Sequence, residues 1–489
     1  KQWLVLALAG MLAVSALAGC GSSSSSTGSA DTASTSTGSA DYDLYIFNNK
    51  GENADAMAAA AEAFGKEKGV KVKAFSLGSG VNSDDTLRTE MNSKNKPAIF
   101  SCMNAETLVE WTEGGFAMDL SKATNEEFKQ LVADIPESFN LTDGTANYGI
   151  PYNVEGYGYI VDKEMLAALF GEDQVDAFLE AFKTATYDEF EQMVLTLQSY
   201  IKEGTAGSVT LSGQEFALAA EKTGKAATLE GVFSVAGSEK WTYGDHFVNI
   251  AVDAIFPDSK AAGEATLEQL QAGKGAFEDL KTANATTPRG PELINATTNG
   301  YDPSVATFAN SKAIFLKQGN WAYENIKKAN ADIVDTLTFL PIKMPFTQDD
   351  IKVEGLTVEH MLESIPVFVP NYYCINDKVS DEEKELAEEF LVWLNTTEAG
   401  QKFVVEEMSF IPYNADPATT SAGYSLGDSI ISYMAADKTL TNAYAGAPKG
   451  WATDNFGLQM MENYVNTAEW PETAYSDIAD YAISSWAEM

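Results

Sequence analysis

Histidine, cysteine and basic residues are all scarce in this chain of 489 residues. The only two histidines, His246 and His360, lie far apart, and no His-Glu-x-x-His pattern occurs, so a zinc site of the zincin type is excluded. No Gly-x-x-x-x-Gly-Lys-Ser/Thr loop is present, which excludes ATP hydrolysis by that mechanism. We therefore expect a protein without catalytic residues, bound metal or cofactor; no EF-hand loop is present, but binding of a calcium ion by scattered carboxylates stays open.

Positive charge is the second shortage. The chain has 32 Lys and Arg against 71 Asp and Glu, which gives a formal net charge of −39. Nucleic-acid binding needs clustered Lys and Arg that neutralise phosphates, so we expect no nucleic-acid partner. The same balance disfavours a strongly anionic ligand, unless a local basic pocket overrides it.

Long apolar runs are missing after the first residues, so we expect no later segment to span a membrane. The early run, from Trp3 to Leu17, follows Lys1, carries no charge and is short for a bilayer, as is typical of a signal peptide. It closes on Leu-Ala-Gly-Cys, which resembles a bacterial lipobox ending at Cys20. That resemblance implies cleavage before Cys20 and attachment of a lipid such as palmitate to its thiol. An ordinary signal peptide with an unrelated cysteine is the alternative.

The residues after Cys20 predict a tether. Residues 21–40 are almost entirely Ser, Thr, Gly and Ala, which cannot bury enough apolar surface to fold. We therefore expect a signal peptide at 1–19, a lipid-anchored flexible linker at 20–40, and a folded body from Asp41 onward. That body is long enough for two to three ordinary domains.

The two remaining cysteines leave their redox state open. Cys102 and Cys374 both lie inside apolar runs that are typical of strands. An exported chain could pair them in a disulfide. Two buried free thiols are the alternative, and the sequence does not give the distance between them.

The order of predicted elements favours an α/β fold. Strands are expected at 41–47, 70–77 and 97–103, alternating with helices at 55–68 and 84–93, which predicts βαβ units and a mainly parallel sheet. A helical middle follows, and the residues 381–395 form a strong amphipathic helix with a capping box from Ser380 to Glu383. The remaining predicted helices are 163–170, 175–182, 187–202, 216–235 and 261–281, and the remaining predicted strands are 313–316, 336–340 and 366–375.

Several blocks of sequence resemble one family when they are taken in order. The blocks are Tyr-Gly-Ile-Pro-Tyr-Asn-Val-Glu-Gly-Tyr-Gly-Tyr at 148–159, Phe-Ala-Asn-Ser-Lys-Ala-Ile-Phe-Leu-Lys-Gln-Gly-Asn-Trp-Ala-Tyr at 308–323, and the stretch from Tyr-Cys-Ile-Asn at 373–376 to Ile-Pro at 411–412. They resemble the sugar-binding, maltose-binding-protein-like class of extracellular solute-binding lipoproteins that serve ABC transporters.

That resemblance implies an architecture and a role. It implies two α/β lobes of the periplasmic-binding-protein type, joined by hinge strands, with the ligand cleft between them. Lobe one would comprise 41–150 plus 365–413, and lobe two 154–360 plus 414–489. The protein would act as a monomer, held on the outer side of the cell membrane by the lipid on Cys20, and would pass a neutral mono- or oligosaccharide to the permease subunits.

Sugar chemistry selects the candidate ligand-binding residues. A sugar ring needs flat aromatic faces for its C–H groups and short polar side chains for its hydroxyls. Such residue types cluster at the ends of predicted strands and in loops, and each of them has packing or a solvated turn as its alternative role. The resemblance implies that Trp321 is the strongest candidate for stacking, because it follows Gly319 and Asn320 at the turn that the family uses for this contact. The candidates are Asn48, Asn49, Lys50, Asn104, Glu106, Tyr152, Asn153, Glu155, Tyr157, Trp241, Tyr243, Asp245, Asn320, Trp321, Trp451, Asp454 and Asn455.

Two other functions stay open at this point. The same fold could bind a peptide, a polyamine or a metal complex, and a cation would suit the acidic composition. A lipid-anchored glycoside hydrolase would need only two carboxylates at a suitable separation, which 71 acidic residues can supply by chance. The ordered blocks of sequence favour the binding protein over the enzyme.

Overall fold

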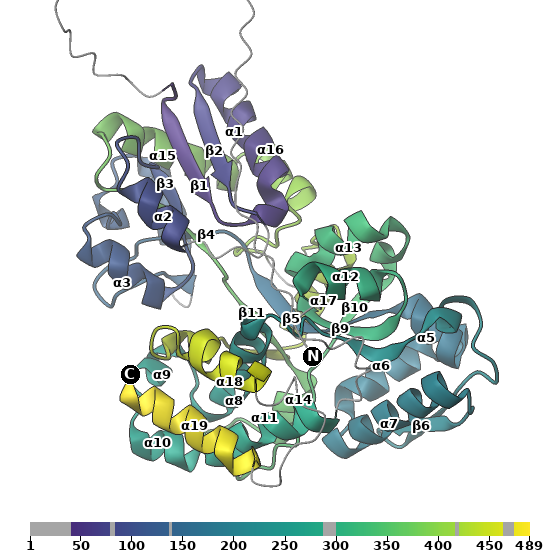
Figure 1. Cartoon of the computed structure of the whole chain (residues 1–489). Coiled ribbons are helices and arrows are strands. Elements are labelled where there is room, and N and C mark those ends of the chain that lie inside the picture. Colours follow the sequence, from purple (N-terminus) through teal and green to yellow (C-terminus); the bar gives the residue numbers. More distant parts are fainter. Residues whose placement is uncertain (1–40, 79–83, 136–138, 287–299, 416–419, 463–473) are drawn as a thin grey trace, which may run out of the picture. The chain divides into compact units, whose positions relative to one another are not determined.

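The computed structural model describes residues 41–78, 84–135, 139–286, 300–415, 420–462 and 474–489. The predicted signal peptide, Cys20 and the linker lie outside these residues. The body from Asp41 to Met489 groups into one compact unit by its internal contacts. Its chain path is drawn in Figure 1, and it contains two large mixed sheets and a small hairpin.

The first sheet contains the N-terminal βαβ units that the sequence predicts. Strand β1 pairs in parallel with β2 and β3, and all five of its residues are buried, as expected for a central strand covered on both faces. A strand from much later in the chain, β12, then adds antiparallel to β3. The order is β2 (Val72–Ser76), β1 (Leu44–Asn48), β3 (Ile99–Cys102), β12 (Tyr372–Ile375) and β4 (Ile150–Pro151).

Helices pack against this sheet through apolar stripes. Helix α1 (Ala54–Lys68) ends at Gly69, whose φ of 73° is the left-handed conformation that glycine adopts without strain. Helix α15 (Asp381–Thr396) begins with the predicted capping box, and its Phe390 meets Phe64 of α1 edge to face. The other helices of this part are α2 (Asp84–Met91), α3 (Ala105–Glu113), α4 (Glu126–Ala133) and α16 (Glu398–Lys402).

The second sheet is built around β5 (Glu155–Asp162), whose eight residues are all buried. One edge of β5 pairs antiparallel with β9, and the other edge pairs with β11 near its start and with β10 near its end. The sheet order is β13 (Thr439–Leu440), β11 (Ile365–Phe368), β5, β9 (Ala313–Gly319) and β8 (Gly231–Ser234), with β10 (Leu337–Leu340) beside β5.

The remaining described helices lie in the same part of the chain as the second sheet, and one expectation about this part was wrong. Residues 216–235 are not a helix: they contain the end of a hairpin, a 3-10 turn and β8, because Thr and Gly interrupt the apolar pattern. The hairpin is β6 (Ser208–Leu211) with β7 (Gln214–Ala217). The helices are α5 (Lys163–Phe170), α6 (Val175–Thr184), α7 (Tyr187–Glu203), α8 (Val248–Ile255), α9 (Ser259–Gly263), α10 (Leu267–Ala272), α11 (Lys274–Thr286), α12 (Tyr301–Ala309), α13 (Tyr323–Ala329), α14 (Val358–Glu363), α17 (Ser425–Ala435), α18 (Leu458–Met460) and α19 (Ala474–Glu488).

The chain passes between the two sheets in short extended segments. Residues 152–154 join β4 to β5, and residues 369–371 join β11 back to β12. These segments are tied together, since the amide of Tyr152 donates to the carbonyl of Asn371 and the amide of Val154 donates to Ile411. Strand β11 therefore lies in the second sheet, whereas the predicted lobe boundary at 365 assigns its residues to lobe one. The lobe boundaries stay a prediction.

The two cysteines of the folded body are free thiols. Cys102 lies on β3 and Cys374 on the neighbouring strand β12, and both are buried in the same apolar cluster as Phe47 and Phe100. The Sγ atom of Cys102 lies 3.3 Å from the hydroxyl of Thr107. Burial raises the pKa of the Cys374 thiol well above its usual value. Of the two alternatives left open by the sequence, the structure has the buried free thiols.

Candidate functional site

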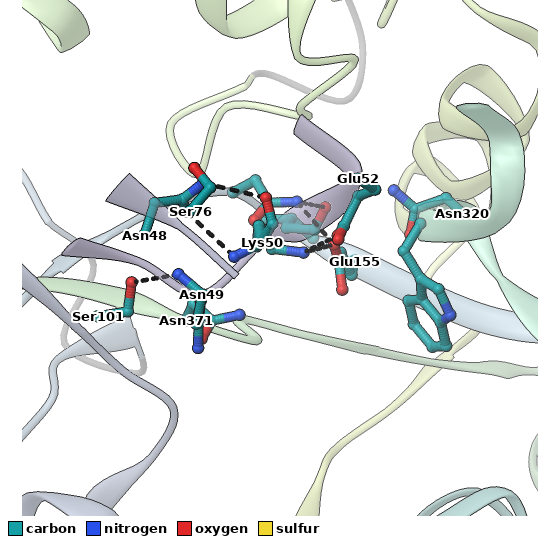
Figure 2. Close-up of polar contacts among 12 residues, drawn as sticks. Asn48, Asn49, Lys50, Glu52, Ser76, Ser101, Glu155, Asn320 and Asn371 are labelled. Atoms are coloured by element: carbon teal, nitrogen blue, oxygen red, sulfur yellow. Dashed lines mark hydrogen bonds and ion pairs between the residues drawn. The ribbon is translucent and has the colours of Figure 1, made fainter. Parts of the chain in front are cut away.

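Lys50 lies at the centre of a buried group of charges. It follows β1, and its Nζ atom forms ion pairs with Glu155, the first residue of β5, and with Glu52, whose Oε1 is 3.2 Å away. Figure 2 shows the two carboxylates converging on the ammonium group. Asn153 donates from Nδ2 to Glu155 Oε1 over 3.2 Å. The structure thus joins three predicted site residues, and it connects the end of a strand in the first sheet to the start of a strand in the second.

The charges of this group stabilise one another. Burial on its own lowers the pKa of Lys50, because a charged ammonium loses its hydration. The neighbouring carboxylates of Glu155 and Glu52 outweigh that effect, and the pKa of Lys50 is raised above its ordinary value. Lys50 therefore stays protonated inside the protein, and its charge is matched locally rather than offered to an anionic ligand.

Asn48 and Asn49 shape the loop that carries Lys50. Asn48 is fully buried; its Nδ2 donates to Ser76 Oγ over 3.0 Å, and its Oδ1 accepts the amide of Lys50. The Nδ2 of Asn49 donates to Asn371 Oδ1 over 2.6 Å. The Oδ1 atom of Asn49 is buried and has no hydrogen-bond partner among the described residues. This acceptor, and the similarly unpaired Oδ1 of Asn153, could receive a hydroxyl of a ligand.

Asn320 holds the turn at the end of β9. Its Oδ1 accepts the amide of Gly156 over 3.0 Å, and its Nδ2 donates to the hydroxyl of Tyr424 over 2.9 Å. The side chain is 4 % exposed, so both ends of the amide serve the fold in this conformation. The turn that presents Trp321 is therefore fixed to β5 on one side and to the start of α17 on the other.

Trp321 belongs to a wall of aromatic rings. Its ring centroid lies 5.2 Å from His246, 6.4 Å from Tyr157 and 6.5 Å from Trp241. Tyr157 and His246 stack on each other at 4.3 Å, and the Tyr157 hydroxyl donates to the backbone carbonyl of His246. Trp321 is only partly buried, so part of the indole remains available for contact. The three predicted residues Tyr157, Trp241 and Trp321 are brought together here.

A small pocket joins the charged group to the aromatic wall. Its lining includes Glu155 and Asn320 together with the indole of Trp321. The volume of about 10 Å³ is close to that of one water molecule, which is far less than a sugar ring needs. A ligand that reaches these residues has to widen the pocket or lie mostly outside it. The remaining lining residues are Glu52, Asn53, Tyr323, Glu324, Met408, Ser409 and Phe410.

The predicted clusters at 241–245 and 451–455 lie side by side on two π-helices, η6 (Thr242–Phe247) and η11 (Trp451–Gly457). Gly244 allows this, since a Cβ atom there would lie 2.1 Å from the carbonyl oxygen of Ala452. The hydroxyl of Thr453 donates to Asp245 over 2.7 Å, and Asp454 pairs with Lys240. Single-turn π-helices often occur at functional sites.

Asp245 has a perturbed acidity. Burial raises its pKa to about 7, the hydrogen bond from Thr453 opposes that rise, and the charges of Glu106 and Asp454 add to it. Glu106 lies in the first turn of α3, beside the first sheet, so two predicted site residues from distant parts of the chain sense each other's charge.

Several predicted site residues are occupied by the fold itself. Trp451 is fully buried; it donates from Nε1 to Ser485 and packs 4.5 Å from Trp486. Asn104 caps α3 by accepting the amide of Thr107. The buried ring of Tyr152 stacks on Tyr373 with an interplanar angle of 17°. Tyr243 is also buried, 4.8 Å from the Nζ atom of Lys317, and Asn455 accepts the hydroxyl of Tyr481.

The sequence as a whole matches a known family. The family of bacterial extracellular solute-binding proteins is matched over residues 59–425, which is three quarters of the chain. The chain belongs to this family. No curated protein sequence matches this solute-binding protein significantly.

Solved structures agree on the fold. A sugar transporter from Bacillus licheniformis in complex with stachyose aligns with a TM-score of 0.58 and 16 % identity, covering 91 % of this chain and 99 % of the other. The GacH receptor of Streptomyces glaucescens, whose structure is known in complex with acarbose, aligns with a TM-score of 0.60 and 12 % identity. The alignment covers 91 % of this chain and 97 % of the receptor. A protein from the xylan-utilising Caldanaerobius polysaccharolyticus aligns with a TM-score of 0.61 and 13 % identity. The alignment covers 90 % of this chain and 99 % of that protein. The two-lobe solute-binding fold that the sequence predicts is thereby confirmed.

Sequence reasoning missed some members of the site. Glu52 shares the Lys50 ammonium, His246 stacks on Tyr157, and Gln318 accepts the indole N–H of Trp321 over 3.0 Å. Each lies within three residues of a predicted site residue, so widening each cluster would have found them. Phe410 and Asn371 had no such signal, because only the fold brings them to Lys50 and Asn49.

The expectation that the chain has no Gly-x-Ser-x-Gly pattern is wrong. Gly-Tyr-Ser-Leu-Gly at 423–427 has the spacing of a hydrolase nucleophile elbow. In the structure Ser425 begins α17, no strand occurs in the described residues 420–424 before it, and its hydroxyl donates to the backbone carbonyl of Val334. It therefore lacks the strand–turn–helix setting of a nucleophile.

Within the described ranges no group of three or more His, Cys, Asp or Glu could hold a metal, and no helix could cross a membrane.

Proposed function

We propose that this solute-binding protein captures a neutral mono- or oligosaccharide outside the cell and delivers it, chemically unchanged, to the permease of an ABC importer. The partly exposed indole of Trp321 carries the proposal. It lies at the end of β9 within a wall of aromatic rings, next to the carboxylate of Glu155 and the amide of Asn320.

The chemistry of these neighbours suits a sugar. An indole face covers the C–H groups of a pyranose ring, and ionised carboxylates and amide oxygens accept hydrogen bonds from its hydroxyls. The unpaired Oδ1 atoms of Asn49 and Asn153 are further acceptors. Lys50 is neutralised by two carboxylates, so the pocket holds no spare positive charge for an anionic ligand. The stachyose and acarbose complexes of proteins with the same fold support this class of ligand.

The mechanism we propose is a shift of population between open and closed arrangements of two lobes. A ligand that contacts both lobes binds the closed arrangement better and so increases its share. We start from the predicted lobes, 41–150 plus 365–413 and 154–360 plus 414–489, and move β11 (Ile365–Phe368) to the second lobe, because it pairs with β5. The segments 152–154 and 369–371 are the natural hinges because they are short and join the two sheets.

The cellular setting completes the proposal. Cys20 would carry a lipid that anchors the protein at the outer face of the cell membrane, and residues 21–40 would act as its tether. The protein would work as a monomer with the permease subunits as its partner. Mass spectrometry of the protein from bacterial membranes tests the anchor, since a Cys20→Ala variant should lose the lipid mass.

A thermal-shift screen tests the ligand class. Raffinose, stachyose, chito-oligosaccharides, xylo-oligosaccharides and acarbose are compared with amino acids, peptides, polyamines and divalent cations. A ligand at one hundred times its Kd adds about 2.7 kcal/mol to the free energy of unfolding, which raises Tm measurably. A shift with one sugar class supports the proposal. A shift with peptides or cations alone would replace the ligand, and release of reducing ends would point to a hydrolase.

A further inference from the structure

Gly319 and Trp321 occupy one another's space. A Cβ atom at position 319 would lie 2.1 Å from Cζ3 of the indole, 2.3 Å from Cη2 and 2.4 Å from Cε3. These are distances that real Cβ atoms do not show, so no residue other than glycine fits while the indole stays where it is. The benzene ring of Trp321 thus lies directly against the backbone at the end of β9.

The backbone conformation does not explain this glycine. Gly319 has φ of −104° and ψ of −179°, which is extended backbone that any residue can adopt. Position 319 therefore requires glycine because the indole of Trp321 approaches the backbone there, and not because of the backbone conformation.

The register of the sheet shows what the missing side chain makes possible. Gly319 pairs with Tyr157 across the antiparallel strands β9 and β5. Opposite residues in such a pair project their side chains on the same face of the sheet. Gly319 leaves that face empty beside Tyr157, and the indole of Trp321 folds back to fill it, with a distance of 6.4 Å between the two ring centroids.

The other end of the indole is held by the preceding residue. The Nε1–H group donates to Oε1 of Gln318 over 3.0 Å, and Gln318 is completely buried. The ring therefore lies between a glycine at its benzene edge and the buried amide of Gln318, which accepts its N–H. Because the aromatic neighbours Trp241 and His246 lie at 6.5 and 5.2 Å, the orientation of the indole is fixed before any ligand arrives.

We propose that Gly319 and Gln318 are positioning residues that hold Trp321 in the orientation needed to stack on the ligand. This inference rests on the proposed function in one respect, namely that the indole is the stacking face. Pre-orientation raises affinity because the ligand does not have to immobilise the ring on binding.

The test is a double-mutant cycle in the whole chain with Gly319→Ala, Trp321→Ala and the double variant. Overpacking at a fixed site costs stability, so Gly319→Ala should lower Tm by about 2 °C or more. In the Trp321→Ala background the same change should leave Tm within about 1 °C, because the clashing ring is gone. Gly207→Ala is the matched control, since its Cβ would meet its nearest neighbour, Thr196, at an ordinary 3.8 Å.

Affinity for the sugar found in the screen supplies the second readout. Gly319→Ala and Trp321→Ala should each weaken binding by about 10-fold or more, and the double variant should be no weaker than Trp321→Ala. Equal Tm losses for Gly319→Ala with and without the indole would overturn the inference, and so would wild-type affinity in Gly319→Ala. If no sugar binds the wild-type chain, the proposed function fails, and the Tm cycle, which needs no ligand, still decides whether Gly319 positions the ring.

Discussion

Replacing Lys50 by methionine should lower the free energy of unfolding more than most other changes in the candidate site. Methionine keeps most of the apolar stem and removes only the charge. Lys50 is 5 % exposed and Glu155 is 4 % exposed, so the pair is removed from water almost completely. In Lys50→Met the carboxylates of Glu155 and Glu52 remain buried next to each other without a counter-charge.

The magnitude follows from that burial. Removing one partner of a buried ion pair costs about 3–5 kcal/mol, most of which is the penalty for the charge left behind. The lower end applies here, because the Asn153 amide still donates a hydrogen bond to Glu155. Glu155→Gln added to Lys50→Met should recover part of the loss, since it removes the stranded charge.

Urea unfolding at neutral pH measures these differences, with the midpoint and slope compared across the variants. Lys66→Met is the control, because Lys66 also forms an ion pair, with Glu62, but both side chains are mostly exposed at 74 % and 68 %. It should change stability little. A loss for Lys50→Met no larger than that of the control would refute the reasoning, as would a double variant less stable than Lys50→Met.

Three further outcomes are expected. Trp451→Ala should cost about 3–5 kcal/mol of stability because the ring is fully buried, whereas Trp321→Ala should cost far less and reduce ligand affinity instead; chemical denaturation and titration separate the two. Burial raises the pKa of Asp253 to about 8. The contribution of its protonated carboxyl to the free energy of unfolding is full below about pH 4 and is lost as the pH rises through 8. Asp253→Asn should therefore flatten the dependence of Tm on pH between about pH 4 and 8. Cys102 and Cys374 should resist a thiol reagent such as DTNB in the native protein and both react after unfolding; rapid reaction of the native thiols would contradict their burial.

The sequence predicted most of the fold because its local signals agree with the tertiary structure. Helix α15 has both an apolar stripe and a capping box, and β1 is a run of apolar residues next to a clear helix. The helix predicted at 216–235 is wrong because the apolar residues there have no clear period. The conformation of its last part is decided by the pairing of β8 with β9. The partner strand lies about eighty residues away in the sequence, so the local sequence around β8 does not indicate this pairing.

The candidate site was predictable in its location and less so in its details. Trp321 and Lys50 come from strand ends, where the α/β fold concentrates ligand contacts. Trp451, like Trp241, is followed within four residues by Thr and Asp, yet it is fully buried, because α19 packs over η11. Whether an aromatic side chain faces a cleft or a core depends on such long-range packing, which composition does not encode.

Calorimetric titration of the wild-type chain and Trp321→Ala with the oligosaccharide from the screen tests the central claim most directly. The account predicts one site per chain in the wild type, with a negative heat-capacity change from burial of apolar surface. It also predicts affinity about 10-fold or more weaker for Trp321→Ala, with a loss of stability far smaller than that of Trp451→Ala. Equal affinity in the two proteins, or binding of peptides or cations with no sugar bound, would contradict it.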